Sequence, residues 1–123
     1  MSGIKILLDT NVVLYFLNGD ETLAGFFEDK DLYVSVITEM ELLSYKGISD
    51  EETTHVEGFL SECNIVNIDI SVKAEAVRIR RKYGNKLPDS IIAATASVMD
   101  IPVITADTGF NKIDEITLIS YQR

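Results

Sequence analysis

The chain has 123 residues, of which 46% are hydrophobic and 25% charged, the balance of an ordinary soluble globular domain. Eleven basic and 20 acidic residues give a formal net charge of −9, which disfavours binding to membrane surfaces and nonspecific coating of DNA. The single cysteine, Cys63, excludes an internal disulfide and a zinc site built from thiolates. We therefore expect one domain over residues 1–123 that folds without a metal or disulfide to stabilise it.

The sequence shows no segment typical of export or of a membrane span. The apolar run near the N-terminus meets Asp9 too early to form the core of a signal peptide. The longest nearly apolar stretch, residues 91–99, is about half as long as a membrane helix. We therefore expect a cytoplasmic protein that makes no contact with a membrane.

The single histidine narrows the possible chemistry. His55 stands in the polar run of residues 51–55, and no motif around it would orient the imidazole as a base or a metal ligand. We expect His55 on the surface of a helix and expect no Ser-His-Asp triad. Any catalysis must therefore use carboxylates.

Apolar runs and helical periodicity alternate along the chain. The apolar runs predict strands over residues 4–8, 32–37, 65–68, 103–105 and 116–121. Helical spacing predicts a helix that begins at the turn of residues 9–11, and further helices over residues 21–29, 72–83 and 89–99. The last of these is apolar nearly all round, which predicts that it is buried.

Two more helices are predicted from capping boxes, in which a Ser or Thr and a Glu three residues later bind each other's backbone amides. Thr38 and Glu41 predict a helix that begins at Thr38 and stops at Gly47. Ser49 and Glu52 predict a polar helix running towards residue 62. The alternation of strands and helices predicts a three-layer α/β fold with a central, mostly parallel sheet of about five strands and helices on both faces.

Four acidic residues fall where predicted strands end or adjoining helices begin. Asp9 follows the first strand, Glu41 opens the helix after the second, Asp89 opens the helix before the fourth, and Asp107 follows the fourth. Binding sites in open parallel sheets form beyond the carboxyl ends of the strands. We therefore expect the four carboxylates to meet at one edge of the sheet.

Each acid also has a purely structural interpretation. Asp9 would cap a helix, Glu41 would complete the box with Thr38, Asp89 would favour a helix dipole, and Asp107 would form an Asx-turn. Together they are harder to explain in this way, because burying like charges near one another raises their pKa values and destabilises the fold. A divalent cation would relieve the repulsion, and carboxylates without His or thiolate favour Mg²⁺ or Mn²⁺. Such sites carry out phosphoryl chemistry.

Four segments carry a resemblance to a known family. They read ILLDTN at 6–11, VSVITEMELL at 34–43, LPDSIIAATA at 87–96 and VITADTGF at 103–110. In this order they resemble the segments of a PIN domain, and more closely those of the VapC-type toxin ribonucleases of prokaryotic toxin–antitoxin pairs. The resemblance implies a PIN-like fold over the whole chain. It also implies a Mg²⁺-dependent (or Mn²⁺-dependent) endoribonuclease that is the toxin of a type II toxin–antitoxin pair.

The resemblance implies a role for each of several residues. Asp9, Glu41, Asp89 and Asp107 fall on the family's acidic quartet as catalytic residues and metal ligands, with Asp9 and Asp89 as direct ligands. Asn11 and Thr105 fall on positions that line the same pocket and hold waters or acids in place. Many relatives carry a further acid where this chain has Gly109, which implies a second metal that binds weakly or only when RNA is present. The implied reaction is in-line attack of a metal-bound water on phosphorus, leaving 5′-phosphate and 3′-hydroxyl ends.

RNA, a small antitoxin protein and a second copy of the chain are the expected partners. Six of the eleven basic residues lie between residues 73 and 86, which lead directly into Asp89. Among them we expect Arg78, Arg81, Lys82 and Lys86 to guide the RNA backbone. A solvated helix face explains this stretch equally well. The resemblance implies that the early helices hold the antitoxin and take part in a homodimer.

Two other functions stay open from the residues alone. A receiver-like phosphoacceptor domain also places acids at strand ends and binds magnesium, but it has paired acids after its first strand, where this chain has Asp9-Thr10-Asn11. A haloacid-type phosphatase requires D-x-D, and residue 11 is asparagine. A PIN fold kept as a catalytically weak RNA- or protein-binding module is the other alternative, and the complete quartet argues against it.

Overall fold

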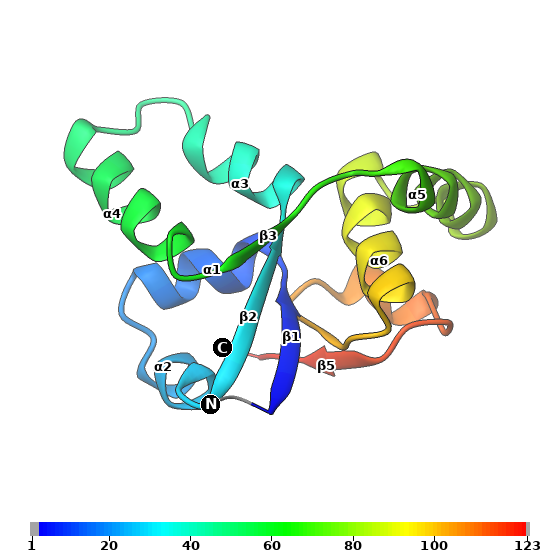
Figure 1. Cartoon of the computed structure of the whole chain (residues 1–123), viewed down its shortest axis with the longest axis horizontal. Helices are drawn as coiled ribbons and strands as arrows, with labels where there is room; N and C mark the ends of the chain where they lie inside the picture. Colours follow the sequence, from blue (N-terminus) through cyan, green and yellow to red (C-terminus); the bar gives the residue numbers. More distant parts are fainter. Residues whose placement is uncertain (1–2, 123) are drawn as a thin grey trace.

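A computed structural model describes residues 3–122 of the chain (Figure 1). The first half contains β1 (Ile4–Leu8), α1 (Thr10–Leu17), α2 (Glu21–Phe27), β2 (Lys30–Ser35), α3 (Val36–Leu43) and α4 (Asp50–Leu60). The second half contains β3 (Asn64–Val66), α5 (Ile70–Tyr83), α6 (Leu87–Met99), β4 (Val103–Thr105), the 3₁₀ helix η1 (Thr108–Lys112) and β5 (Leu118–Ser120). Within the described residues, no helix has the length and apolar character that a membrane crossing needs.

The five strands form one sheet in the order β3-β2-β1-β4-β5, and every neighbouring pair is parallel. The central strand β1 pairs with β2 through Leu7 and Tyr33 and with β4 through Leu7 and Val103. Parallel pairing requires a crossover between strands, and the helices supply it. The prediction of a three-layer α/β fold with a mostly parallel sheet of about five strands is confirmed.

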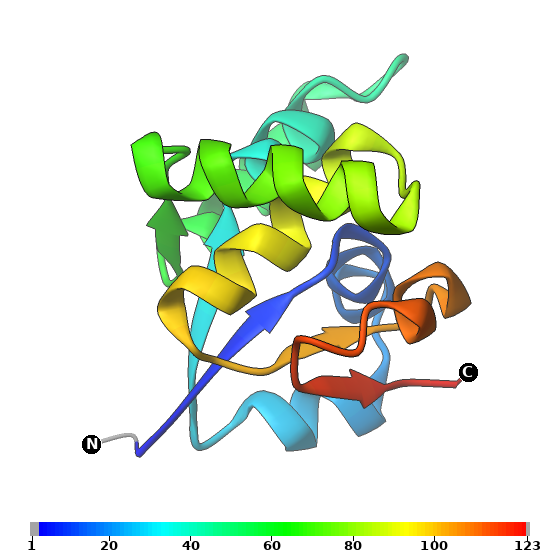
Figure 2. The same cartoon turned by 90° about the vertical axis from the view of Figure 1, so that its right-hand side faces the viewer.

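Helices cover both faces of the sheet. Helices α5 and α6 lie on one side of it and α1, α2 and α4 on the other, and α5 and α6 stand in front of the strands when the molecule is turned by 90° (Figures 1 and 2). The side chains of β1 alternate between the two layers, because Leu7 packs with α5 and α6 while Ile6 and Leu8 pack with α1, α2 and α4. The sheet is therefore buried on both faces, which explains its continuous apolar strands.

Helix α6 is the buried helix that its composition predicts. Ala93, Ala94 and Ala96 are all buried, and small side chains at these positions let α6 lie close to α5. Pro88 stands in its first turn, where the missing N–H has no intrahelical partner to lose. Helix α5 ends at Gly84, whose φ of 75° is left-handed and suits glycine.

One predicted capping box is wrong and the other is confirmed. Helix α3 begins at Val36 with Ser35 as its N-cap, so Thr38 lies inside the helix and does not cap it. The sequence prediction extended the strand to residue 37 because Val36 and Ile37 are β-branched, but the Ser35 hydroxyl accepts the Ile37 amide and starts the helix earlier. The box of Ser49 and Glu52 is present at the start of α4.

Candidate active site

All five strands end at the same edge of the sheet because they are parallel, and the predicted acids gather along that edge. Asp9 directly follows β1, and Asp107 follows the neighbouring strand β4 after one intervening residue. Helix α3 leaves the same edge from β2 and carries Glu41. Helix α6 leads back to the start of β4, so its first turn, with Asp89, lies at this edge as well. We call these four residues the acidic cluster.

Asp9 is the buried member of the acidic cluster. It is 5% exposed, and its Oδ1 accepts the backbone N–H of Thr10 at 2.8 Å. Its Oδ2 accepts the hydroxyl of Thr105 at 2.6 Å. Burial raises the pKa of Asp9 to about 6, the hydrogen bonds from Thr105 and Thr10 oppose this rise, and the charges of Asp89 and Asp107 add to it.

The negative charges of other members of the acidic cluster act on the carboxyl group of Asp89. Burial raises the pKa of this half-buried carboxyl, and the charges of Asp107 and Glu41 raise it further. The ammonium of Lys86 acts in the opposite direction. The charges of Asp89 and Asp107 in turn raise the pKa of Asp9, so Asp89 interacts electrostatically with every other member of the acidic cluster.

Glu41 is held by a residue that the sequence analysis did not single out. The Thr10 hydroxyl donates to Glu41 Oε1 at 2.7 Å and lies 2.9 Å from the hydroxyl of buried Thr38. Because Thr10 has one hydroxyl proton, Thr38 donates to Thr10 and Thr10 donates to Glu41. The capping box considered for Glu41 with Thr38 is absent, because Glu41 lies in the second turn of α3, far from its N-cap Ser35. The feature of the sequence that could have indicated this role is the position of Thr10 directly after Asp9.

Asp107 is held by its own turn. Its side chain accepts the N–H of Gly109 at 2.8 Å, so the Asx-turn foreseen for it is present at the start of η1. Its backbone N–H donates to the Thr105 hydroxyl oxygen at 2.9 Å. Thr105 thus joins Asp9 and Asp107 through its hydroxyl.

Asn11 lies farther from these contacts. Its side chain is exposed, and it lines an open hollow of about 370 Å³ together with Thr10 and Glu41. The hollow therefore borders the acidic cluster on the side of α1 and α3. No side-chain hydrogen bond links Asn11 to another residue in the described part of the chain.

The donor set fits a hard divalent cation. Among residues 3–122, no three His, Cys, Asp or Glu side chains stand close enough together to grip an ion in their present positions. The acidic cluster nevertheless offers only carboxylate oxygens, which suit Mg²⁺ or Mn²⁺. A cation would also reverse the rise in the pKa of Asp9 that burial and its acidic neighbours cause. Side-chain movements would be needed to bring the carboxylates together.

The four basic residues expected to guide RNA divide into two groups. Arg78 pairs with Glu75 at 2.8 Å and with Glu115 at 2.6 Å, and Lys82 pairs with Glu115 at 3.1 Å. These contacts tie α5 to the connection before β5 and lower the pKa of Glu115 to about 2. Arg81 and Lys86 are exposed and form no ion pair within the described residues.

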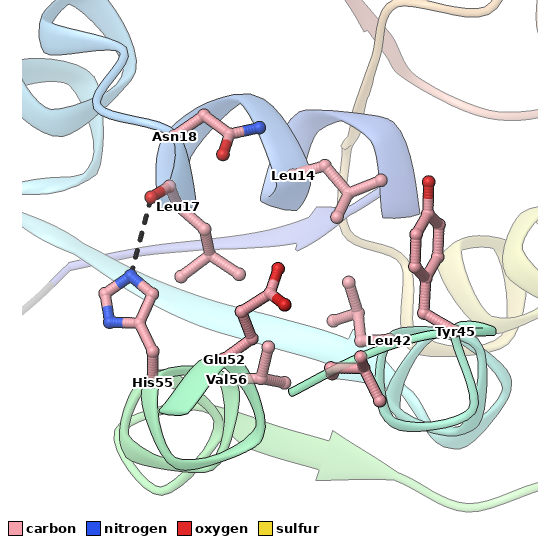
Figure 3. Close-up of a pocket in the computed structure, with 9 residues that line it drawn as sticks. Leu14, Leu17, Asn18, Leu42, Tyr45, Glu52, His55 and Val56 are labelled. Atoms are coloured by element: carbon pink, nitrogen blue, oxygen red, sulfur yellow. Dashed lines mark hydrogen bonds between the residues drawn. The ribbon is translucent and has the colours of Figure 1, made fainter. Parts of the chain in front are cut away.

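A separate apolar groove of about 290 Å³ lies between α1, α3 and α4 (Figure 3). Its lining consists of Leu14, Leu17, Asn18, Leu42, Tyr45, Ile48, Glu52, His55 and Val56. His55 lies on the surface of α4, as predicted, and its Nε2 is 3.4 Å from the carbonyl oxygen of Leu17. The groove shares Leu14, Leu42 and Tyr45 with the hollow beside Glu41, so it continues to the acidic cluster.

Comparison with known proteins identifies the family. Residues 6–116 match the PIN domain family. The matched stretch runs from β1 to just before β5 and includes all four acids. The chain belongs to the PIN domain family. PIN domains are in general nucleases that use divalent metal ions. No curated protein matches the chain significantly.

Solved structures share this fold over nearly their whole length. A toxin–antitoxin complex from Klebsiella pneumoniae is 29% identical, with a TM-score of 0.83 over 96% of this chain and 99% of that one. FitAcB from Neisseria gonorrhoeae is 25% identical, with a TM-score of 0.76 over 94% and 96% of the two chains. DNA-bound VapBC from Salmonella typhimurium is 24% identical, with a TM-score of 0.86 over 96% and 98%. The expected resemblance to VapC-type PIN domains is confirmed.

The PIN domain assignment replaces the receiver-like alternative. Receiver domains have the strand order 2-1-3-4-5, whereas this sheet has the order β3-β2-β1-β4-β5. The chain is therefore a PIN domain and not a receiver domain.

Proposed function

We propose that this PIN domain is a Mg²⁺-dependent endoribonuclease and the toxin of a type II toxin–antitoxin pair. The observation that carries the proposal is the buried carboxyl of Asp9, whose pKa is raised to about 6 beside Asp89 and Asp107. A fold keeps such a costly arrangement where the charges serve a function. Membership of a family of metal-using nucleases gives that function its chemistry.

Asp9, Glu41, Asp89 and Asp107 would hold the cation, with Asp9 and Asp89 as direct ligands. Bound Mg²⁺ supplies water activation and neutralises the charge that develops on the phosphodiester. Thr105 keeps Asp9 Oδ2 oriented, and Thr10 keeps Asp9 Oδ1 and Glu41 Oε1 oriented. These hydrogen bonds favour the ionised carboxylates, which is the form a metal requires.

Lys86 and Arg81 are the basic residues best placed to attract the RNA backbone. Lys86 precedes α6 and its ammonium interacts with Asp89, so a phosphate drawn to it would arrive at the acidic cluster. Arg78 and Lys82, predicted for the same role, are engaged with Glu75 and Glu115. We assign them a smaller contribution to RNA binding.

Cleavage of RNA tests the reaction. Purified protein with Mg²⁺ is expected to cut single-stranded RNA into fragments with 5′-phosphate and 3′-hydroxyl ends, and Asp89→Asn is expected to abolish the cuts. Ser97→Ala on the same helix, away from its N-terminus, is the control for the preparation. RNA that stays intact with Mg²⁺ and with Mn²⁺ would favour a binding module instead.

The apolar groove supports an antitoxin partner. It is lined by leucines and the exposed ring of Tyr45, and it adjoins the hollow beside Glu41, so a helix bound there would reach the Glu41 side of the acidic cluster. A small protein encoded next to this chain is expected to co-purify with it and inhibit cleavage. His55→Glu, at an exposed residue that lines the groove but not the hollow beside Glu41, should weaken that complex and leave free cleavage intact. Val98→Glu, on the exposed α6 surface outside the groove, should not weaken the complex.

A homodimer is proposed from the exposed apolar side chains of α5. Ile70 is 80% exposed and Val77 is 44% exposed, and their spacing of seven residues places them on one face of the helix. Light scattering is expected to give twice the chain mass for the wild type. Ile70→Lys combined with Val77→Lys is expected to give the mass of one chain.

A further inference from the structure

Asn85 is a buried polar residue outside the acidic cluster. It lies between α5 and α6, directly after Gly84, and its side chain is 6% exposed. Its Nδ2 donates to the carbonyl oxygen of Gly109 at 3.0 Å, a contact between residues 24 positions apart. Its Oδ1 is buried without a hydrogen-bond partner among residues 3–122. The amide is therefore oriented by a single bond, to Gly109.

Gly109 links Asn85 to the acidic cluster. Its carbonyl accepts from Asn85, while its N–H donates to Asp107 Oδ1 at 2.8 Å. The backbone N–H of Asp107 donates in turn to Thr105, whose hydroxyl binds Asp9. One line of hydrogen bonds thus runs from the α5–α6 junction to the buried acid.

Because residue 109 is glycine, a contact from outside its turn is needed to hold its backbone in place. A Cβ at residue 109 would lie 3.1 Å from Asp107 Oδ1, so a side chain here would crowd the carboxylate. Glycine avoids that contact, but it has the greatest backbone freedom of any residue. The bond from Asn85 restricts that freedom at the residue whose N–H orients Asp107.

A role in stability alone explains Asn85 poorly. A buried amide oxygen without a partner lowers the stability of the fold, and an apolar side chain of the same shape would avoid this loss. The retained amide therefore has another use. We propose that Asn85 is a positioning residue, which holds Gly109 so that Asp107 presents its carboxylate to the divalent cation; this inference rests on the proposed function.

Two substitutions separate positioning from folding. Asn85→Leu removes the donor to Gly109 and the unpaired Oδ1 together at nearly constant volume; the two effects on stability oppose each other, so the melting temperature is expected to stay close to that of the wild type. Asn85→Ala removes the same donor but leaves a cavity where the amide was. Thr95→Ala is the matched control, because its buried hydroxyl on α6 donates to the Ile91 carbonyl at 2.8 Å and forms no hydrogen bond to Asn85 or Gly109 among the described residues.

The readouts are Mn²⁺ affinity by calorimetry and, in metal-free protein, the NMR signals of the Gly109 amide and the Asp107 carboxyl carbon. Both Asn85 variants are expected to weaken Mn²⁺ binding about tenfold or more and to shift both signals. Thr95→Ala is expected to leave affinity and signals unchanged. Wild-type affinity in Asn85→Leu, or unshifted signals, would overturn the inference. Failure of the wild type itself to bind Mn²⁺ would overturn the proposed function and, with it, this role of Asn85.

Discussion

The hydroxyl of Thr10 donates to Glu41 Oε1 at 2.7 Å and so fixes an exposed acid of α3 against the start of α1. The backbone N–H of the same threonine donates to Asp9 Oδ1 at 2.8 Å. One residue therefore orients two members of the acidic cluster that lie 32 positions apart in the chain.

Replacing Thr10 by valine tests this arrangement. The change keeps the β-branched shape and the backbone bond to Asp9 but removes the donor to Glu41, so RNA cleavage is expected to fall about tenfold or more. Thr10→Ser keeps the hydroxyl and is expected to retain most of the activity. Initial rates across a range of Mg²⁺ concentrations measure the effect. Equal rates for the valine variant and the wild type would show that Glu41 needs no such support.

Asp9→Asn is expected to separate activity from stability. The amide cannot carry the negative charge a cation needs, so RNA cleavage should be lost. In EDTA at neutral pH the same change removes a buried charge and should raise the free energy of unfolding, by at most about 3 kcal/mol for a pKa raised to about 6. Thermal melts in EDTA check the second effect. A variant that still cuts RNA would contradict the role of Asp9.

The stability of the metal-free protein should depend on pH in a defined direction. The folded-state pKa of Asp9 is raised to about 6, above the value of about 4 in an unfolded chain, so the folded state holds the proton longer. The contribution of this proton is complete below about pH 4 and is lost as the pH rises to about 6. Burial also raises the pKa of Asp89, which acts in the same direction.

Urea melts in EDTA measure this dependence. Between about pH 4 and pH 6, the wild type should lose more unfolding free energy than Asp9→Asn does, because the variant lacks the titrating group. Comparing the two chains cancels the contributions of the remaining acids. Parallel pH curves for the two proteins would show that Asp9 does not titrate in this range.

Lys86 and Arg78 should differ in their effect on RNA binding. Lys86→Gln removes an unpaired charge beside Asp89, and it is expected to weaken RNA binding and reduce its salt dependence by about one unit in the logarithmic slope. Arg78→Gln removes a charge that Glu75 and Glu115 already neutralise, so it should change the slope less. Fluorescence anisotropy with a labelled RNA and the Asp89→Asn chain measures binding without cleavage. The reverse ranking would contradict this account.

The sequence predicted the layers of the fold well because their signals are local. The apolar run before Asp9 and the small residues of α6 each report burial directly, and the structure confirms both. The start of α3 was misplaced because Val36 and Ile37 have strand propensity while the cap at Ser35 is one side-chain bond. Propensity and capping compete at such boundaries, and the cap prevailed here.

The acids were predictable from their places next to strand ends, whereas two of the residues that orient them, Thr10 and Asn85, were not. The bonds from Thr10 to Glu41 and from Asn85 to Gly109 join elements distant in the chain, so no spacing rule reveals them. The pairing of Arg78 and Lys82 with Glu115 is equally nonlocal. A basic helix in the sequence looks the same whether its charges are free or engaged.

Anomalous diffraction from a crystal soaked in Mn²⁺ tests the central claim most directly. We expect a peak at the carboxyl edge of the sheet with carboxylate oxygens of Asp9 and Asp89 at direct coordination distance, and its loss in Asp9→Asn. A well-ordered site with no peak between these side chains, or a peak that persists in Asp9→Asn, would contradict the proposal that the acidic cluster holds a catalytic cation.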